Sequence, residues 1–138
     1  MIPDPKSIAM MHGVHPDLVK VVVAVFTATT IPFRVTYGVC TLEAERGMIA
    51  RGVSSLKDPK SCRHVPTGNP PMGHAVDISI LDHEGNPQWG NQYIHAYISV
   101  GKLFQEASTN LKIPVRSGFM WTTFKDWGHH ELPVTKYP

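Results

Sequence analysis

The sequence is short of charged residues, and its charges nearly balance. Asp, Glu, Lys and Arg make up 17% of the 138 residues, against roughly a quarter in an average soluble domain. The net charge at pH 7 is +2 with neutral histidines. Such a composition excludes disorder driven by charge. Since no stretch interleaves clustered Lys and Arg with aromatic residues, we expect no nucleic-acid partner.

The chain also lacks a long apolar run, a secretory signal and a disulfide framework. Its longest run without Asp, Glu, Lys, Arg or His, residues 21–33, has 13 residues, whereas a membrane-spanning helix needs about 20. We therefore expect no stable membrane insertion. The first ten residues, MIPDPKSIAM, contain an early Asp and two prolines but no apolar core, so we expect no cleavable signal peptide. Two cysteines are too few for a disulfide framework.

What remains fits a small globular protein. The length lies below the rough figure of 150 residues per domain, so we expect one domain over residues 1–138, acting as a monomer. The apolar periodicity predicts helices over 15–29, 42–51 and 93–111, and strands over 33–39, 75–81, 113–116 and 129–132. Residues 1–13 read as an irregular lead-in, and residues 53–73 as a long loop. This order predicts an α+β fold with a mostly antiparallel sheet and helices packed on one side.

The eight histidines point to where chemistry should be sought. His64 lies in the predicted long loop, Asp77 interrupts an apolar strand, and His129 lies near the carboxyl end. An acid within a strand is costly to bury unless it is paired or coordinates a cation. Two imidazoles and one carboxylate leave a fourth position open, as in catalytic zinc sites, and Asp126 could take a proton from a water there. Without an HExxH or CxxC motif, the spacing alone leaves open a metal site or ordinary hydrogen-bonded side chains.

Three segments resemble a known peptidase family. His64 together with residues 73–77, GHAVD, resembles the Ser-x-His-x-x-Gly-x-Ala-x-Asp signature of zinc metallopeptidases related to D-Ala-D-Ala carboxypeptidases and dipeptidases. Residues 13–19, GVHPDLV, and 121–132, WTTFKDWGHHEL, are more particular. They resemble the L-alanyl-D-glutamate peptidases that serve as endolysins of tailed phages. The resemblance runs from about residue 8 to residue 133, in the order of the family.

The resemblance implies a hedgehog/D-Ala-D-Ala peptidase-like fold with a zinc ion in a cleft. It makes His64, Asp77 and His129 the zinc ligands and Asp126 the catalytic carboxylate. Its implied reaction is hydrolysis of the L-Ala–D-Glu bond in the stem peptide of bacterial peptidoglycan for host cell lysis. The enzyme would wait in the host cytoplasm until the membrane is breached. Neighbouring strand residues face opposite sides, so His130 competes with His129, and the Asp-x-x-His spacing favours His129.

The sequence departs from the family pattern at three places. Cys40 and Cys62 stand where the family has an Arg and a Ser that help to hold substrate, so the resemblance assigns both positions to substrate binding and predicts that they are neighbours. Either a disulfide or two free thiols would be consistent with that placement. Six additional residues, within 65–72, separate His64 from Asp77; their prolines stiffen the loop, which could form a rim to the cleft.

Two alternative functions stay open at the level of sequence. A D-Ala-D-Ala-type carboxypeptidase would use the same zinc chemistry at the other end of the stem peptide. A non-catalytic relative, stabilised by zinc and acting as a binding or virion structural protein, would explain the missing Arg and the longer loop.

Overall fold

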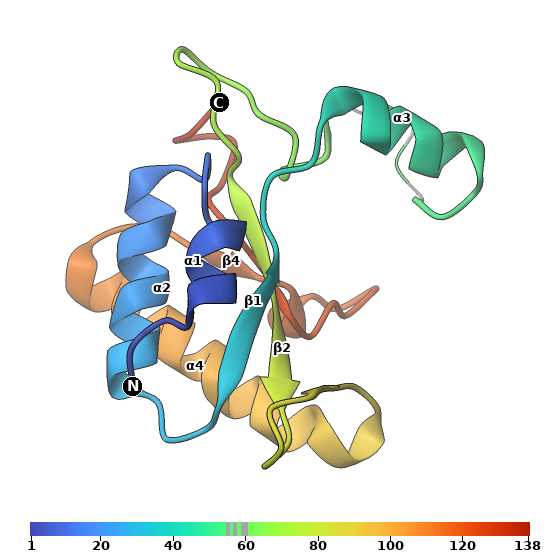
Figure 1. Cartoon of the computed structure of the whole chain (residues 1–138). Helices are drawn as coiled ribbons and strands as arrows, with labels where there is room; N and C mark the ends of the chain where they lie inside the picture. The colour runs from blue at the N-terminus through green and yellow to red at the C-terminus, as the bar shows by residue number, and fades with distance from the viewer. Residues whose placement is uncertain (55, 57, 59–60) are drawn as a thin grey trace.

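The computed structural model describes residues 1–54, 56, 58 and 61–138 (Figure 1). Its strands form one antiparallel sheet. The order across the sheet is β1 (Phe33–Tyr37), β2 (Ala75–Leu81), β5 (His129–Glu131) and β4 (Arg116–Ser117), and β3 (Pro87–Gln88) pairs with the far end of β2. The expected antiparallel arrangement is confirmed.

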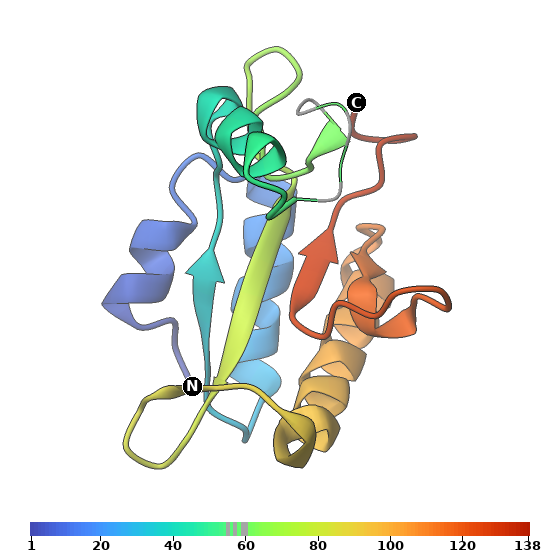
Figure 2. The same ribbon diagram turned by 90° about the vertical axis from the view of Figure 1, so that its right-hand side faces the viewer.

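The sequence of β2, AVDISIL, decides which face of the sheet is covered. Because side chains alternate along a strand, Val76, Ile78 and Ile80 point to one face, where they join the hydrophobic core. Helices α2 (Pro16–Ala28) and α4 (Ile94–Leu111) cover that face, and in Figure 2 they lie behind the strands. Asp77 and Ser79 point to the other face, which is therefore the polar one.

The two covering helices pack through apolar stripes at helical spacing. The buried residues of α2 are Leu18, Val21, Val22, Val25 and Phe26, and those of α4 include Tyr97, Val100, Phe104 and Ala107. Phe26 stacks on Phe33 of β1 with ring centroids 4.1 Å apart, which ties α2 to the edge of the sheet. The expected placement of the main helices on one side of the sheet is confirmed. No helix among the described residues is long and apolar enough to cross a membrane.

A short helix, α1 (Pro5–Met10), replaces the irregular lead-in expected for residues 1–13, so that expectation was wrong. The Asp4 carboxylate accepts a hydrogen bond from the Ser7 amide at 3.1 Å and one from the Arg34 side chain on β1 at 2.6 Å. The Ser7 hydroxyl accepts the Val35 amide at 2.9 Å. A six-residue helix is marginal alone, so these contacts with β1 explain why it forms.

Helix α3 (Leu42–Ala50) lies away from the core and over the polar face of the sheet (Figures 1 and 2). Glu45, its buried residue, accepts a hydrogen bond from the Ser54 hydroxyl at 2.6 Å. The predicted long loop follows, and positions 55, 57, 59 and 60 of it lie outside the described residues. Its later part, around Thr67 and Met72, lines a cavity with His15 and Tyr137 near the start of α2. Residues 65–72 do not line the two grooves that border Asp77 and Glu131, and their role as a rim stays a prediction.

The carboxyl-terminal strands are shorter than expected. The predicted strand over 113–116 is replaced by β4 at Arg116–Ser117, although Ile113 and Val115 are buried in the core. Pro114 explains the difference, because proline has no N–H for a strand ladder. A 3-10 turn over Gly118–Met120 then leads into the loop that returns to β5. This loop carries Asp126.

Candidate metal centre

The register between β2 and β5 places Asp77 directly opposite His129. Directly opposite residues in an antiparallel pair project from the same face, so both side chains lie on the polar face of the sheet. His129 Nδ1 is 2.9 Å from Asp77 Oδ1. The backbone pairing alone therefore brings two of the three expected residues together, although 52 positions separate them in the chain.

His64 reaches the same point from the long loop. Its carbonyl accepts the Cys40 amide at 2.9 Å, which anchors the loop beside the end of β1. Its Nδ1 is 2.7 Å from the Gly38 carbonyl, and its Nε2 is 3.4 Å from Asp77 Oδ2. One ligand atom from each of His64, Asp77 and His129 lies within 4.8 Å of the others. The structure therefore brings together the three residues singled out in the sequence.

The hydrogen bonds around the two imidazoles decide which nitrogens face the centre. A carbonyl oxygen only accepts, so His64 Nδ1 donates to Gly38 and leaves the Nε2 lone pair toward Asp77. His129 Nε2 is 2.9 Å from Glu131 Oε1, and a His129 that keeps one proton, on Nε2, donates there and leaves the Nδ1 lone pair toward Asp77. Two nitrogen lone pairs and a carboxylate thus converge. This donor set fits a divalent cation such as zinc, and the outer hydrogen bonds are of the kind that orient metal-bound histidines.

The charge state of His129 is set by its two carboxylate neighbours when no cation is present. Burial alone would lower the pKa of His129, but the hydrogen bonds and charges of Asp77 and Glu131 outweigh it and raise that pKa to about 9. Burial likewise opposes ionisation of Asp77, yet the hydrogen bonds from His129 and His64 hold its pKa well below the ordinary value. A cation would therefore have to displace a proton from His129.

The strand places His129 and His130 on opposite faces of the sheet. His130 points to the covered face, where its ring stacks on Phe104 with centroids 3.7 Å apart. It is fully buried, and its Nδ1 lies 2.8 Å from the Ser117 hydroxyl. Burial and the charge of His129 lower the pKa of His130 to about 3, so it is a neutral core residue. His129 lies on the polar face beside Asp77, as the Asp-x-x-His spacing favours.

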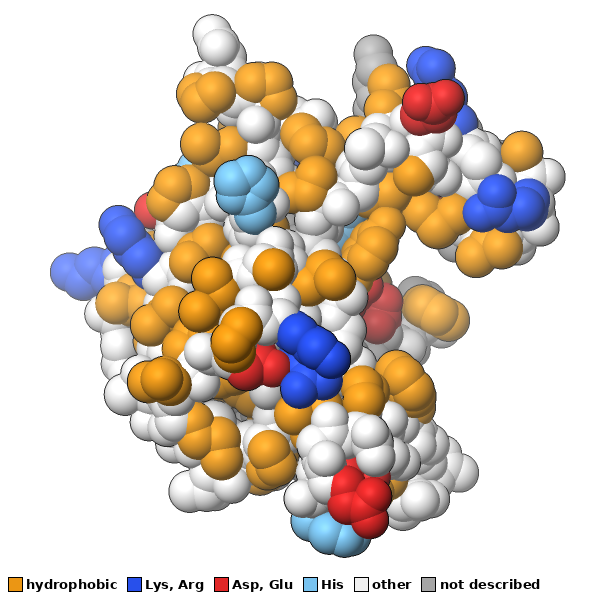
Figure 3. Space-filling view, viewed as in Figure 1, with side chains coloured by type: hydrophobic (Ala, Val, Ile, Leu, Met, Phe, Trp, Pro, Cys, Tyr) orange, Lys and Arg blue, Asp and Glu red, His pale blue; other side chains and the backbone are white. Residues whose placement is uncertain are grey.

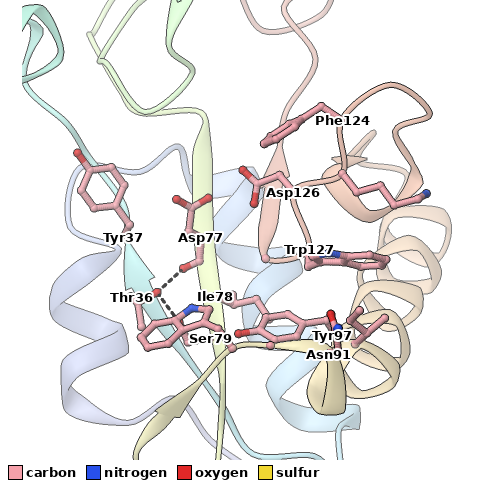
Figure 4. A pocket seen from close by; sticks show the side chains of 15 residues that line it. Thr36, Tyr37, Asp77, Ile78, Ser79, Asn91, Tyr97, Phe124, Asp126 and Trp127 are labelled. Atoms are coloured by element: carbon pink, nitrogen blue, oxygen red, sulfur yellow. Dashed lines mark hydrogen bonds between the residues drawn. The ribbon is translucent and has the colours of Figure 1, made fainter. Parts of the chain in front are cut away.

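Asp126 lies on the loop between β4 and β5, beside the cluster. Its amide donates to the Gly118 carbonyl at 3.2 Å, and a Cβ on Gly118 would collide with the Asp126 backbone. Glycine is therefore needed where the loop closes on itself. Figure 4 shows the carboxylates of Asp77 and Asp126 facing the same opening. Burial and the nearby charge of Asp77 raise the pKa of Asp126, which favours proton exchange by this carboxylate.

Two grooves border the cluster. The first, about 530 Å³, carries Asp77 and Asp126 and is lined by the aromatic side chains of Trp89, Phe124 and Trp127. Figure 4 shows Phe124 and Trp127 beside Asp126. The second, about 850 Å³, lies beside Glu131 and is lined also by Arg63, Arg116 and Trp121. Phe124 borders both. A notch separates α3 from the body of the molecule in the space-filling view (Figure 3). The two grooves adjoin at Phe124.

Both cysteines are free thiols. Cys40 is buried immediately before α3, and its amide bonds to His64, two residues from Cys62. Burial raises the pKa of the Cys62 thiol to about 11, so it stays neutral at physiological pH. Of the two arrangements left open by the sequence, the structure has the free thiols. Neither cysteine lines the two grooves, and their assignment to substrate binding stays a prediction.

Sequence reasoning missed several residues around the centre. Glu131 holds His129, and Tyr37 packs edge-on against the His64 ring with centroids 4.8 Å apart. Tyr37 lies opposite Asp77 because β1 changes register between Val35 and Tyr37. The alternation of His129 and Glu131 on one strand face was readable in the sequence, whereas the irregularity in β1 was not.

Comparisons with known proteins agree with this geometry. Residues 4–132 match the family described as phage L-alanyl-D-glutamate peptidase. An L-alanyl-D-glutamate peptidase of Escherichia phage T5 is 29% identical over 124 residues, covering 90% of this chain and 83% of that protein. The crystal structure of the Serratia marcescens L-Ala D-Glu endopeptidase ChiX has a TM-score of 0.82 and 29% identity, covering 100% of this chain and 94% of that one. The expected fold and the resemblance read from the motifs are both confirmed.

The raised pKa of His129 predicts how the stability of the metal-free protein depends on pH. The folded pKa of about 9 lies above the ordinary value of roughly 6.5, so the stabilisation is fully present below about pH 6.5 and is lost as the pH rises through 9. The loss should be on the order of 3 kcal/mol in the free energy of unfolding. Urea titrations of chelator-treated protein between pH 6 and 10 measure it.

Comparison with two variants assigns this loss to His129. His129→Gln should abolish this pH dependence, whereas His83→Gln, at an exposed turn, should retain it. A constant difference in unfolding free energy between wild type and His129→Gln over this pH range would contradict the assignment.

Proposed function

We propose that this chain, which belongs to the family of phage L-alanyl-D-glutamate peptidases, cleaves the L-Ala–D-Glu bond of the stem peptide with a zinc ion held by His64, Asp77 and His129. By its family the chain is a peptidoglycan endopeptidase. The identity of the metal, the ligand roles and the catalytic role of Asp126 are what the proposal adds. As an endolysin it would act on the cell wall after leaving the host cytoplasm.

The convergence of His64 Nε2, His129 Nδ1 and the Asp77 carboxylate is the observation that carries the proposal. Two neutral nitrogens and one carboxylate oxygen are ligands that zinc accepts in catalytic sites with an open position. Each histidine is already oriented by a hydrogen bond from its other nitrogen, to Gly38 or to Glu131. Little reorganisation would then be required when the ion binds.

When bound, zinc supplies a Lewis acid for the scissile carbonyl and lowers the pKa of a water molecule to roughly 7. The two proton transfers of the reaction are assigned to Asp126. Its carboxylate faces the opening beside Asp77, and burial raises its pKa, so it can accept a proton from the attacking water. It then returns that proton to the departing amine of D-Glu. Phe124 and Trp127 line the same groove as Asp126.

The products of digestion test the proposed bond. Treatment of purified peptidoglycan with the zinc-loaded protein should create a new amino terminus on D-Glu, measured by mass spectrometry of the released muropeptides. Release of D-Ala instead would identify a carboxypeptidase. Unchanged muropeptides would identify a non-catalytic relative.

Asp126→Ala should retain zinc and lose peptidase activity by about 10²–10⁴-fold, since it removes proton transfer and no ligand. Metal content by elemental analysis and the initial rate of stem-peptide cleavage measure the two effects separately. Concurrent loss of zinc would show that Asp126 is a ligand and that the roles are misassigned.

Glu131→Gln should weaken zinc binding about 10–100-fold, because the carboxylate that accepts from His129 Nε2 loses its charge. Competition with a chromophoric chelator measures the affinity directly. Glu106→Gln, at an exposed position of α4, is the matched control and should bind zinc as the wild type does. An unchanged affinity in Glu131→Gln would contradict the role of Glu131.

A further inference from the structure

The two grooves beside the candidate metal centre differ in charge. The aromatic groove contains the carboxylates of Asp77 and Asp126 and one cation, Lys125. The groove beside Glu131 contains two guanidinium groups, Arg63 and Arg116, against that single carboxylate. Since local charge steers a charged ligand toward the groove of opposite sign, an anionic group of a bound peptide belongs beside Glu131.

Of the two guanidinium groups, Arg116 is the one placed to receive a ligand. Arg63 donates to the backbone carbonyls of Leu132 and Tyr137, at 2.6–3.3 Å, and thereby fastens the carboxyl-terminal segment. Arg116 has a side chain that is 56% exposed and only a long contact to Glu131, 3.8 Å from Nη1 to Oε2. Its guanidinium carbon lies 5.9 Å from the Trp121 ring centre, which limits its range of positions.

Lys125, the cation of the aromatic groove, already has partners within the protein. Its ammonium donates to the Phe119 carbonyl at 3.0 Å and lies 5.8 Å from the Trp127 ring centre. Cys40 and Cys62 contribute no positive charge, and both thiols lie outside the two grooves. Arg116 is therefore the cation of these grooves with the greatest capacity for a new partner.

The proposed substrate carries an anion at the matching place. A glutamyl residue has two carboxyl groups, and when one continues the peptide the other remains free within one residue of the scissile nitrogen. Arg116 is also close to the centre. Glu131 bridges Arg116 to His129: its Oε1 is 2.9 Å from His129 Nε2, and its Oε2 is 3.8 Å from Arg116 Nη1. The ring centroids of Trp121 and His129 are 5.4 Å apart.

We propose that the groove lined by Arg116, Trp121 and Glu131 is the subsite for the D-glutamyl residue, and that Arg116 pairs with its free carboxylate. This inference rests on the proposed function. It orients the substrate: the D-Glu side of the bond lies beside β4, and the L-Ala side lies in the aromatic groove of Phe124 and Trp127. Arg116 thereby determines specificity for a free carboxylate over its amide, because a carboxamide offers no charge to pair.

Two synthetic stem peptides test the subsite. They are identical except that the free carboxylate of D-Glu is a carboxamide in the second. Wild-type zinc-loaded protein should favour the carboxylate peptide on the order of 10-fold in kcat/KM, mainly through KM. Arg116→Gln should lose this preference and cleave both peptides with nearly equal kcat/KM.

Two control variants separate charge in the subsite from charge elsewhere. Lys125→Gln, in the aromatic groove, should retain the preference for the carboxylate peptide, as should Lys102→Gln on the exposed face of α4. Loss of the preference in Lys125→Gln but not in Arg116→Gln would overturn the proposed orientation of the substrate. Zinc affinity is measured for each variant by chelator competition. If Arg116→Gln binds zinc more weakly and keeps the preference, Arg116 acts through Glu131 and the subsite is wrong.

The outcomes distinguish this inference from the function on which it rests. If the wild type cleaves neither peptide, the proposed function fails. If it cleaves both equally well, and Arg116→Gln does the same, the endopeptidase function stands and only the subsite is overturned.

Discussion

The register between β2 and β5 is the constraint on which the site depends. Pairing Asp77 with His129 places a carboxylate and an imidazole on the polar face and, at the next position, sends His130 into the core against Phe104. A shift of β5 by one residue would reverse this: His129 and Glu131 would point into the core, and His130 would point to the polar face. Stability and chemistry are therefore set by the same hydrogen-bond ladder.

The residues around Asp77 and His129 fix the orientation of the histidine rings at the site. Gly38 and Glu131 each lie at hydrogen-bond distance from one nitrogen of a histidine, so the other nitrogen of each ring faces Asp77. Such preorganisation lowers the cost of holding an ion and keeps the open side of the centre toward the grooves. The price is electrostatic: without an ion, His129 holds a proton between two carboxylates.

The uncovered face of the sheet is asymmetric, and this asymmetry bears on how a peptide would lie. Aromatic side chains and the carboxylate of Asp126 border one groove, while guanidinium groups border the other. A substrate with a carboxylate on one side of the scissile bond would therefore favour one binding orientation over the reverse. The same polar face that gives the centre access to solvent thus also supplies discrimination between the two ends of a peptide.

The sequence by itself determined the antiparallel α+β class, the main helices and β2, because apolar periodicity and the alternation in AVDISIL are local signals. It also singled out His64, Asp77, His129 and Asp126, because the motifs that contain them resemble those of a known peptidase family. Tertiary structure decided that α1 forms, through its contacts with β1, whereas the short β4 follows from Pro114, a local signal in the sequence. Arg116 came to border the centre only when β4 paired with β5, whereas Glu131 lies on the same strand face as His129 through local alternation. Periodicity records which face a residue takes, but not which residue lies across from it.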